Sequence, residues 1–383
     1  MRDQLKPLFS PFALGSLTLP NRFVMSPMTR NFSPGGVPGA DVAAYYRRRA
    51  EAGIGMIITE GVAPDHPAAV GDGTTPGPSI PHMHGKAALT GWKAVVDAVH
   101  EAGGRIAPQL WHMGPVRVPG TGAFPDAPSV RPSGIWGSLN DAVLPPAYRD
   151  AVAQPTAPAT ELEIADTIAG FALAAANAVA VGFDAIALHG AHGYLIDSFL
   201  WAETNRRTDR WGGNAAERTR FAVAVIEAVR REMPAGMPLI LRISQWKIQD
   251  YAATLATTPD ELETILAPLV AAGVDLFDVS TRRFETPAFA GSDLSLAGWV
   301  RKLSGKPVMT VGGVGFDKDL QSSFVEETHA RDNLDEVARR FDAGEFDLVA
   351  VGRAILMDTD WINKVRRGEG FGAFNLAAYG SLV

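Results

Sequence analysis

Cysteine is absent from this 383-residue sequence. Without thiols, the chain cannot form disulfides, iron–sulfur clusters or thiolate zinc sites, and it has no cysteine nucleophile. An excess of positive charge is also missing, because 42 acidic residues outnumber 35 basic ones and the formal net charge is −7. Such a chain has no field to attract a polyanion, so a nucleic-acid partner is not expected.

Long uninterrupted apolar stretches are scarce as well. The start, MRDQLKPLFSPF, has no run of signal-peptide length, so the expected location is cytoplasmic. Residues 164–188 are apolar enough to imitate a membrane span, but they include Asp166, Asn177 and Asp184. The Gly-Phe-Asp break at 182–184 instead predicts an alanine-rich helix, a turn and a buried strand, with no membrane partner.

Eight short apolar runs recur along the chain. They are RFVMSPM, GMIITEG, RIAPQL, DAIALHG, LILRIS, VDLFDVS, PVMTVGG and FDLVAVG. Their near-continuous hydrophobicity is typical of parallel strands that are covered on both faces. Helix-like patterns follow them at residues 40–52, 85–102, 160–181, 214–232, 259–272, 293–303, 333–343 and 359–367. Eight such units predict an α/β fold, the (β/α)8 TIM barrel, and FALGSLTLPN predicts an N-terminal β-hairpin across its floor.

A long span, residues 112–159, shows neither helical nor strand periodicity and is rich in proline, glycine and alanine. Loops of this length in compact domains are commonly functional. The span follows the third strand, which in a barrel places it on the catalytic rim, so we expect a capping or lid insertion there. No linker interrupts the chain, and residues 1–383 are expected to form a single domain.

Side chains just past the carboxyl ends of barrel strands converge on one mouth. Few carboxylates occupy those positions, so a metal ion would depend on His189 and His192 almost alone. Glycine pairs in VGGVG and AVGRA, at the last two strand ends, favour a phosphate site, because backbone N–H groups can approach an anion there. VGGVGF lacks dinucleotide-binding spacing, so a phosphate-bearing cofactor is the better prediction. The strand-end candidates are Pro27, Met28, Thr29, Glu60, Gly61, Gln109, Trp111, His112, His189, His192, Arg242, Ser244, Gly312, Gly313, Gly352 and Arg353.

Two blocks, HGAHGYLIDSFL and TNRRTDRWGGNAAERTRF, resemble the signature of the Old Yellow Enzyme family of FMN-dependent ene-reductases. PNRFVMSPMTR, YYRRRAEAGIGMIITEG, GRIAPQLWHMG, LRIS, VGGV and AVGRAIL match other blocks of the family in order, over about residues 8–370. The resemblance implies FMN as cofactor, NADH or NADPH as reductant, and an electron-poor alkene, a small molecule, as substrate of a ping-pong reaction. It leaves open whether the chain forms a homo-oligomer.

The resemblance also implies roles for individual residues. The FMN phosphate is expected at Gly312, Gly313, Gly352 and Arg353. The ring is expected against Pro27, Met28, Thr29, Gly61, Gln109, His189 and Arg242, and the arginine would balance negative charge that accumulates on reduction. His189 and His192 match the pair that grips a carbonyl or nitro oxygen, and Tyr194 matches the proton donor. Trp111 and Trp246 would border the substrate.

Three points stay open at the sequence level. The stretch GDGTTPGPSIPHMHG, which contains loop 72–84, departs from relatives that carry an aromatic side chain above the flavin, so its role is unassigned. Lys247 is expected either to touch substrate or nicotinamide or to decorate an exposed loop, and Arg207 and Asp209 are expected to fasten the loop after the fourth strand, with Gly212 and Gly213 starting the next helix. The alternatives to an ene-reductase are a metal-dependent barrel hydrolase and a flavin-binding module without alkene turnover.

Overall fold

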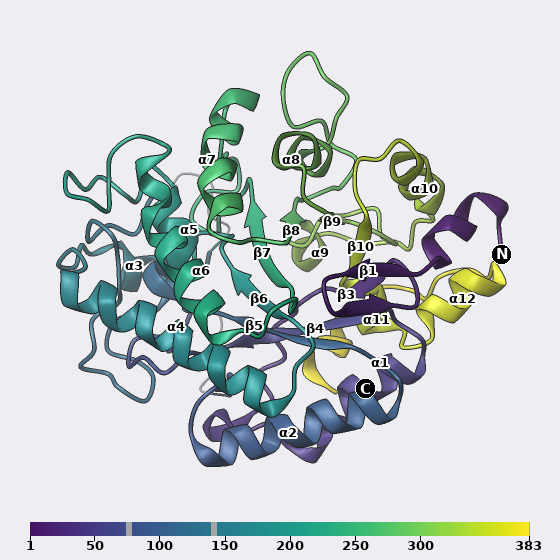
Figure 1. Ribbon diagram of the computed structural model, residues 1–383, viewed down its shortest axis with the longest axis horizontal. Coiled ribbons are helices and arrows are strands. Elements are labelled where there is room, and N and C mark those ends of the chain that lie inside the picture. Colours follow the sequence, from purple (N-terminus) through teal and green to yellow (C-terminus); the bar gives the residue numbers. More distant parts are fainter. Residues whose placement is uncertain (74–78, 139–143, 383) are drawn as a thin grey trace.

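Eight parallel strands form a closed barrel in the computed structural model, which describes residues 1–73, 79–138 and 144–382 (Figure 1). The strands follow one another around the barrel in the order β10, β3, β4, β5, β6, β7, β8 and β9. Their bounds are β3 Phe23–Met25, β4 Met56–Val62, β5 Ile106–Leu110, β6 Ile186–His189, β7 Leu239–Ser244, β8 Leu276–Ser280, β9 Val308–Val311 and β10 Leu348–Val351. The predicted barrel is confirmed, and no strand extends more than one residue beyond the apolar run that predicted it.

Helices surround the barrel, as covered parallel strands require (Figure 1). The eight that follow the strands are α1 Ala40–Glu51, α2 Lys86–Glu101, α4 Glu161–Val181, α6 Arg220–Glu232, α7 Pro259–Ala271, α8 Leu296–Ser304, α10 Leu334–Asp342 and α12 Trp361–Arg367. Short 3₁₀ turns are η1 Asp3–Phe9, η2 Pro34–Gly36, η3 Gly114–Val116, η4 Glu217–Thr219 and η5 Leu376–Gly380. All eight helical segments predicted from the sequence contain a helix.

The start of α6 corrects one expectation. Gly212 and Gly213 do not begin this helix. Asn214 and Glu217 exchange side-chain-to-backbone hydrogen bonds of 2.9 and 3.0 Å, and η4 then leads into α6. A Cβ on Gly212 would lie 2.0 Å from the carbonyl oxygen of Arg207, so this glycine permits a close backbone approach.

The hairpin closes the barrel floor, as predicted. Its strands, β1 Phe12–Leu14 and β2 Leu17–Leu19, pair antiparallel. Phe12, Leu17 and Leu19 pack into the same buried cluster as the barrel-interior residues Val24, Met56 and Ile58. Removing each large apolar side chain of this cluster from water contributes roughly 1.5–3 kcal/mol.

Four short helices were not expected from the sequence. They are α3 Pro146–Ala153, α5 Leu195–Leu200, α9 Ser322–Val325 and α11 Arg353–Met357. The expectation that 112–159 lacks regular structure is therefore wrong for α3, which begins with a proline and buries Tyr148 and Val152, one turn apart. Residues 139–143 of this insertion lie outside the described residues.

One helix of the described residues, α4, is long and apolar enough to cross a membrane by length and composition. A capping box of Thr160 and Glu163 begins it, and Gly182, with a left-handed φ of +104°, ends it at the predicted break. It packs against α2 and α6 and buries Ile164 and Phe171. Packing in the outer ring of helices thus accounts for its apolar composition.

Candidate active site

Three side chains from one short segment meet at the carboxyl end of β6. His189 is the last residue of that strand, and the next loop carries His192 and Tyr194. The centroid of the His189 ring lies 5.1 Å from that of His192 and 4.8 Å from that of Tyr194, edge to face in both cases. The two imidazoles are 8% and 9% exposed. The structure therefore brings the predicted cluster together.

Burial decides the protonation of this cluster. It lowers the pKa of His189 and of His192 well below the usual range, and the positive charge of Arg242 lowers both further. Desolvation raises the pKa of Tyr194 above that of a free phenol. At neutral pH the site therefore holds two neutral imidazoles beside a protonated phenol.

The backbone at His192 and Gly193 is strained, and hydrogen bonds hold it in place. His192 and Gly193 have left-handed conformations, with φ of +63° and +80°, and this costs about 1–2 kcal/mol for a residue with a Cβ atom. The His192 N–H donates to Ser244 Oγ at 2.9 Å, and the His192 carbonyl accepts the N–H of Ile248 at 3.1 Å. The Gly193 N–H donates to Asp197 at 2.7 Å.

A fully buried ion pair ties this turn to the loop after β7. Lys247 Nζ donates to Asp197 Oδ1 at 2.7 Å, and neither side chain is exposed. Burial raises the pKa of Asp197 and lowers that of Lys247, while their mutual attraction opposes both shifts. Gln249, also buried, donates to the Gly193 carbonyl at 3.0 Å. Both expectations for Lys247 are wrong, because its ammonium group is buried and binds Asp197, which also accepts the N–H of Gly193.

The imidazole of His192 is fixed on two sides. Trp246 stacks on it, with centroids 4.1 Å apart and ring planes 18° apart. Ser280, the last residue of β8, has its Oγ 2.8 Å from His192 Nε2. His189 is fixed differently, because its Nδ1 accepts the N–H of Ala191 at 3.3 Å. Sequence reasoning found Trp246 but missed Ser280, although the serine ends one of the eight apolar runs.

Arg242 is buried in the barrel mouth, so its ion pair is not a surface one. Its Nε donates to Asp278 at 2.6 Å, and its NH2 group donates to Ser26 Oγ at 2.9 Å. Burial raises the pKa of Asp278, and the arginine opposes this shift. The partners lie on β8 and just after β3, so a cation is held at one defined position of the rim.

Gln109, in β5, has a buried amide nitrogen that lacks a hydrogen-bond partner within the described residues. Its backbone N–H donates to Thr59 Oγ1 of β4 at 3.2 Å. Leaving a buried amide donor unpaired costs free energy, so a ligand that offers an acceptor here is favoured.

Glu60, in β4, shapes the loop that carries residues 27–29. Its Oε2 accepts the N–H groups of Arg30 at 2.8 Å and Asn31 at 2.9 Å, and Asn31 has a left-handed φ of +62°. Burial raises the pKa of Glu60 to about 7, and these two hydrogen bonds oppose the rise. Within this loop, Pro27 and Met28 are half-buried and Thr29 is exposed.

Glycines form a tight cradle at the ends of β9 and β10. Gly312 and Gly313 have φ of +146° and +72°. A Cβ on Gly312 would lie 2.4 Å from the carbonyl oxygen of Thr281, so a side chain does not fit there. Gly352 lies beside Met28, whose Sδ would be 3.4 Å from an added Cβ. Five residues with predicted cofactor contacts therefore come from neighbouring strand ends: Met28, Gly312, Gly313, Gly352 and Arg353.

Arg353, the first residue of α11, is a predicted phosphate contact that also makes hydrogen bonds within the protein. Its guanidinium donates to the carbonyl oxygens of Lys318 at 2.6 Å and Asp319 at 3.0 Å. The side chain thus holds the loop after β9. A phosphate would share this guanidinium with the two carbonyls or use the backbone N–H of Arg353.

Apolar side chains wall the mouth beside Tyr194. Trp111 contacts Tyr194 edge to face with centroids 5.0 Å apart, and a Cβ on Gly61 would lie 2.5 Å from the Trp111 ring. Tyr194 packs with Ile248 against a buried cluster, to which the insertion 112–159 contributes Met113, Val116, Trp136, Tyr148 and Val152. In loop 72–84, His82 stacks on His84, and residues 74–78 lie outside the described residues.

His112 is structural in this arrangement. Its Nδ1 accepts the N–H of Gly114 at 3.0 Å, and its Nε2 lies 3.0 Å from Nδ1 of His66. Within residues 1–73, 79–138 and 144–382, no group of three or more histidine, aspartate and glutamate side chains is arranged to hold a metal ion. The hydrolase alternative thus finds no ligand set in that part of the chain.

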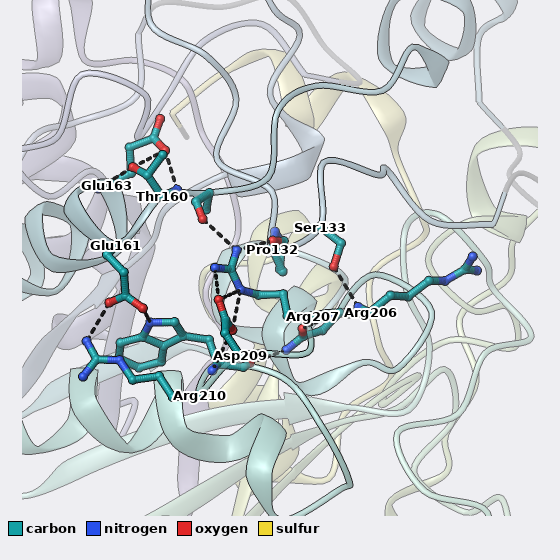
Figure 2. A network of polar contacts seen from close by, with 12 residues as sticks. Pro132, Ser133, Thr160, Glu161, Glu163, Arg206, Arg207, Asp209 and Arg210 are labelled. Atoms are coloured by element: carbon teal, nitrogen blue, oxygen red, sulfur yellow. Dashed lines mark hydrogen bonds and ion pairs between the residues drawn. The ribbon is translucent and has the colours of Figure 1, made fainter.

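Figure 2 shows how the insertion 112–159 is fastened to the loop after α5. Arg207 donates to the carbonyl oxygens of Pro132 at 2.7 Å and Ala159 at 2.6 Å, and its Nε donates to Asp209 at 2.9 Å. The predicted fastening role of Arg207 and Asp209 is confirmed, and the structure adds the insertion as its target.

Comparison with known proteins identifies the family. Residues 7–370 match the NADH:flavin oxidoreductase / NADH oxidase family, the FMN-dependent family of Old Yellow Enzyme. The chain belongs to this family. The resemblance drawn from the sequence motifs is confirmed, and with it FMN as the cofactor of this Old Yellow Enzyme family member.

Two curated relatives align with this Old Yellow Enzyme family member over part of their own length. An NADH oxidase of Thermoanaerobacter brockii is 31% identical over 373 residues, which are 94% of this chain and 51% of the relative. The 12-oxophytodienoate reductase 7 of Oryza sativa subsp. japonica is 39% identical over 233 residues, 60% of this chain and 56% of the relative. The chain thus spans about half the length of these curated relatives.

Solved structures confirm the barrel over nearly the whole chain. Morphinone reductase matches with a TM-score of 0.77 and 26% identity, covering 97% of this chain and 92% of that protein. Its complex with tetrahydroNAD matches with a TM-score of 0.78 and 27% identity, covering 97% and 93%.

The mouth of this Old Yellow Enzyme family member fits its FMN cofactor. The unpaired amide nitrogen of Gln109 offers a donor, and Arg242 offers a fixed cation. Gly312 and Gly313 have no Cβ atom, so a phosphate could approach the backbone N–H groups of this cradle closely. These donors suit a group that combines a planar ring bearing acceptors with a phosphate tail.

Proposed function

We propose that this chain is an FMN-dependent oxidoreductase that reduces the activated C=C bond of α,β-unsaturated carbonyl or nitro compounds with NADH or NADPH. The observation that carries the proposal is the packing of two buried imidazoles, His189 and His192, against the phenol of Tyr194. When bound, FMN supplies the two-electron chemistry that links a nicotinamide nucleotide to an electron acceptor. The residues of the chain then determine which acceptor reacts.

The imidazoles provide the clamp in this proposal. Each neutral ring has one N–H donor, and two donors aimed at one carbonyl or nitro oxygen stabilise the negative charge that develops there. Removing one such donor typically costs about 3 kcal/mol of transition-state stabilisation. Trp246, stacked on His192, and Trp111, packed against Tyr194, would border the substrate carbon skeleton.

Tyr194 is the proton source in this proposal. Its raised pKa keeps the phenol protonated throughout the neutral range, so it can act as a general acid toward the α-carbon. Edge contacts with Trp111 and His189 fix the ring direction.

The FMN-binding residues of the proposal are those predicted from the motifs. Pro27, Met28, Thr29, Gly61, Gln109, His189 and Arg242 would hold the ring, and Gly312, Gly313, Gly352 and Arg353 the phosphate. Arg242 is fixed by Asp278 and Ser26, so its charge would stay in place as negative charge accumulates nearby. Glu60 adds support from outside the predicted set, because it fixes the turn after Thr29.

The insertion 112–159 acts in this proposal as a lid within a single domain that spans residues 1–383. Its apolar cluster against Tyr194 would exclude water from the substrate. Nicotinamide and alkene would use the same mouth in turn, which gives ping-pong kinetics. The complex of morphinone reductase with tetrahydroNAD supports a nicotinamide site in this fold. A cytoplasmic location and assembly into a homo-oligomer remain predictions.

The test is an anaerobic assay of the purified protein with NADH, NADPH and a panel of enones and nitroalkenes. The proposal expects FMN absorbance, nicotinamide oxidation that depends on the alkene, and a saturated product. A flavin-binding module without alkene turnover would show the same absorbance with no saturated product. Nicotinamide oxidation that occurs in a parallel aerobic assay, with oxygen as the sole effective acceptor, would also contradict the alkene assignment.

A further inference from the structure

The proton positions on the two histidines decide whether they can clamp an oxygen. A neutral imidazole carries one proton, and the hydrogen bond at one nitrogen sets which nitrogen has it. Nδ1 of His189 accepts the N–H of Ala191 at 3.3 Å, which leaves the proton on Nε2. His192 is held at the opposite nitrogen, because its Nε2 lies 2.8 Å from Ser280 Oγ. The free nitrogen of His192 is therefore Nδ1.

Ser280 Oγ can serve Nε2 of His192 either as acceptor or as donor. Within the part of the chain that the structure describes, the hydroxyl of this 6% exposed serine has no other partner. As an acceptor, the hydroxyl would leave its own buried proton unpaired. His192 would then carry its proton on Nε2, and the lone pair of Nδ1 would face the substrate oxygen. Both consequences are unfavourable. As donor, it satisfies its proton and leaves an N–H at Nδ1.

Neighbouring groups are already committed and do not compete for this hydrogen bond. Ser244 donates to the Trp246 carbonyl at 2.8 Å and accepts the backbone N–H of His192 at 2.9 Å. The nearby cations are also engaged, because Lys247 pairs with Asp197 and Arg242 pairs with Asp278. The stacked Trp246 restrains the plane of the imidazole, which keeps Nε2 directed at Ser280.

We infer that Ser280 is a positioning residue whose hydroxyl donates to His192 Nε2 and thereby fixes the Nδ1–H tautomer, so that the clamp consists of His189 Nε2–H and His192 Nδ1–H. The inference rests on the proposed function for its catalytic consequence. The tautomer itself is a property of the protein in the absence of substrate, and it can be measured separately.

The direct test is a long-range ¹H–¹⁵N correlation spectrum of the FMN-loaded protein labelled with ¹⁵N-histidine, with the His192 signals identified by their loss in His192→Asn. The wild type is expected to carry the His192 proton on Nδ1. Ser280→Ala is expected to move it to Nε2, and Ser280→Thr, which keeps the hydroxyl, is expected to restore Nδ1–H. Ser244→Ala is the matched control, because it removes a hydroxyl that bonds the His192 backbone and should leave the tautomer unchanged.

A kinetic cycle tests the consequence. Ser280→Ala should slow alkene reduction about 10- to 100-fold, somewhat less than complete loss of one donor, whereas Ser280→Thr should stay within about threefold of the wild type. In a His192→Ala background, Ser280→Ala should have no further effect. A wild-type proton on Nε2 of His192, or an unchanged tautomer in Ser280→Ala, overturns the inference. A wild type with Nδ1–H that reduces no alkene refutes the proposed function and leaves the tautomer assignment standing.

Discussion

Tyr194 shows how a single residue acquires its chemistry from its surroundings. The phenol is held between Trp111 and His189, and desolvation keeps it protonated. Nothing in the type of the residue distinguishes it from a packing tyrosine, and its neighbours suit it to the proposed role of an acid.

Tyr194→Phe removes the proposed acid and retains the ring. We expect the rate of alkene reduction to fall about 10²- to 10⁴-fold, with little change in the reduction of the enzyme by NADH, because the hydroxyl has no part in that step. Rapid-mixing measurements of the two half-reactions would show the difference. Equal slowing of both half-reactions, or of neither, would contradict a proton-donor role.

The pH dependence of alkene reduction follows from the same residues. Burial lowers the pKa of His189 and of His192, and it raises that of Tyr194. None of the three should change its charge between about pH 6 and about pH 9, so the rate of the alkene half-reaction should be flat over this range. A bell-shaped profile centred near pH 7 that disappears in Tyr194→Phe would contradict this assignment.

Glu60 gives a prediction about stability. Its pKa rises from 4.5 to about 7 on folding, so the folded state binds more protons than the unfolded chain between these values, and its stability falls as pH rises through them. Glu60→Gln keeps an acceptor for Arg30 and Asn31 but does not titrate. Relative to the wild type, the variant should therefore gain about 2 kcal/mol in free energy of unfolding between about pH 5 and about pH 8.

Urea unfolding at the two pH values measures this difference. Asp166→Asn, at an exposed position of α4, is the control for the loss of one negative charge. An identical difference between Glu60→Gln and wild type at both pH values would show that the carboxyl titrates normally.

Residues whose role depends on a distant partner could not be read from the sequence. Asp197 and Lys247 lie 50 positions apart, and His192 and Ser280 lie 88 apart. A single sequence does not show which strand ends face each other, so these pairs emerge only when the barrel closes. His189, His192 and Tyr194 were found because they share one short motif. Ser280 ends the run VDLFDVS, and applying the strand-end rule to that run would have found it.

At the scale of elements, the eight strands were predictable because each apolar run has the near-continuous hydrophobicity of a strand that is covered on both faces. The helices were predictable from the helix-like patterns that follow these runs. The short helices α3 and α5 were not, since six to eight residues give too little periodicity to separate a helix from a loop. The turn at His192 and Gly193 also escaped prediction, because its left-handed shape is imposed by contacts with the loop after β7.

Lys247→Met tests how strongly that loop holds the turn. The substitution leaves the carboxylate of Asp197 buried without its cation, which typically destabilises a protein by about 3–5 kcal/mol. The double variant Lys247→Met, Asp197→Asn should recover part of this loss, because the amide oxygen can still accept the N–H of Gly193. Chemical unfolding gives the values, with exposed Lys86→Met as the matched control. A loss below about 1 kcal/mol for Lys247→Met would show that the pair is not important for folding.

At the scale of the whole molecule, the barrel brings distant segments to one mouth. Arg242 and its partners come from β7, β8 and the residue after β3, and side chains of the insertion 112–159 belong to the cluster that packs against Tyr194. In the proposed function, both reactants would use this mouth in turn. Steady-state kinetics with NADH and an enone should accordingly give parallel double-reciprocal lines, and intersecting lines would reject alternate occupation of a shared mouth.

The most direct test of the central claim is to mix the FMN-loaded, pre-reduced protein with an enone under anaerobic conditions and to follow the return of flavin absorbance. The account predicts rapid return in the wild type and a rate at least about 100-fold lower when His189 and His192 are both replaced by alanine. A wild type that stays reduced with every enone and nitroalkene, or a double variant that reoxidises as fast as the wild type, would contradict it.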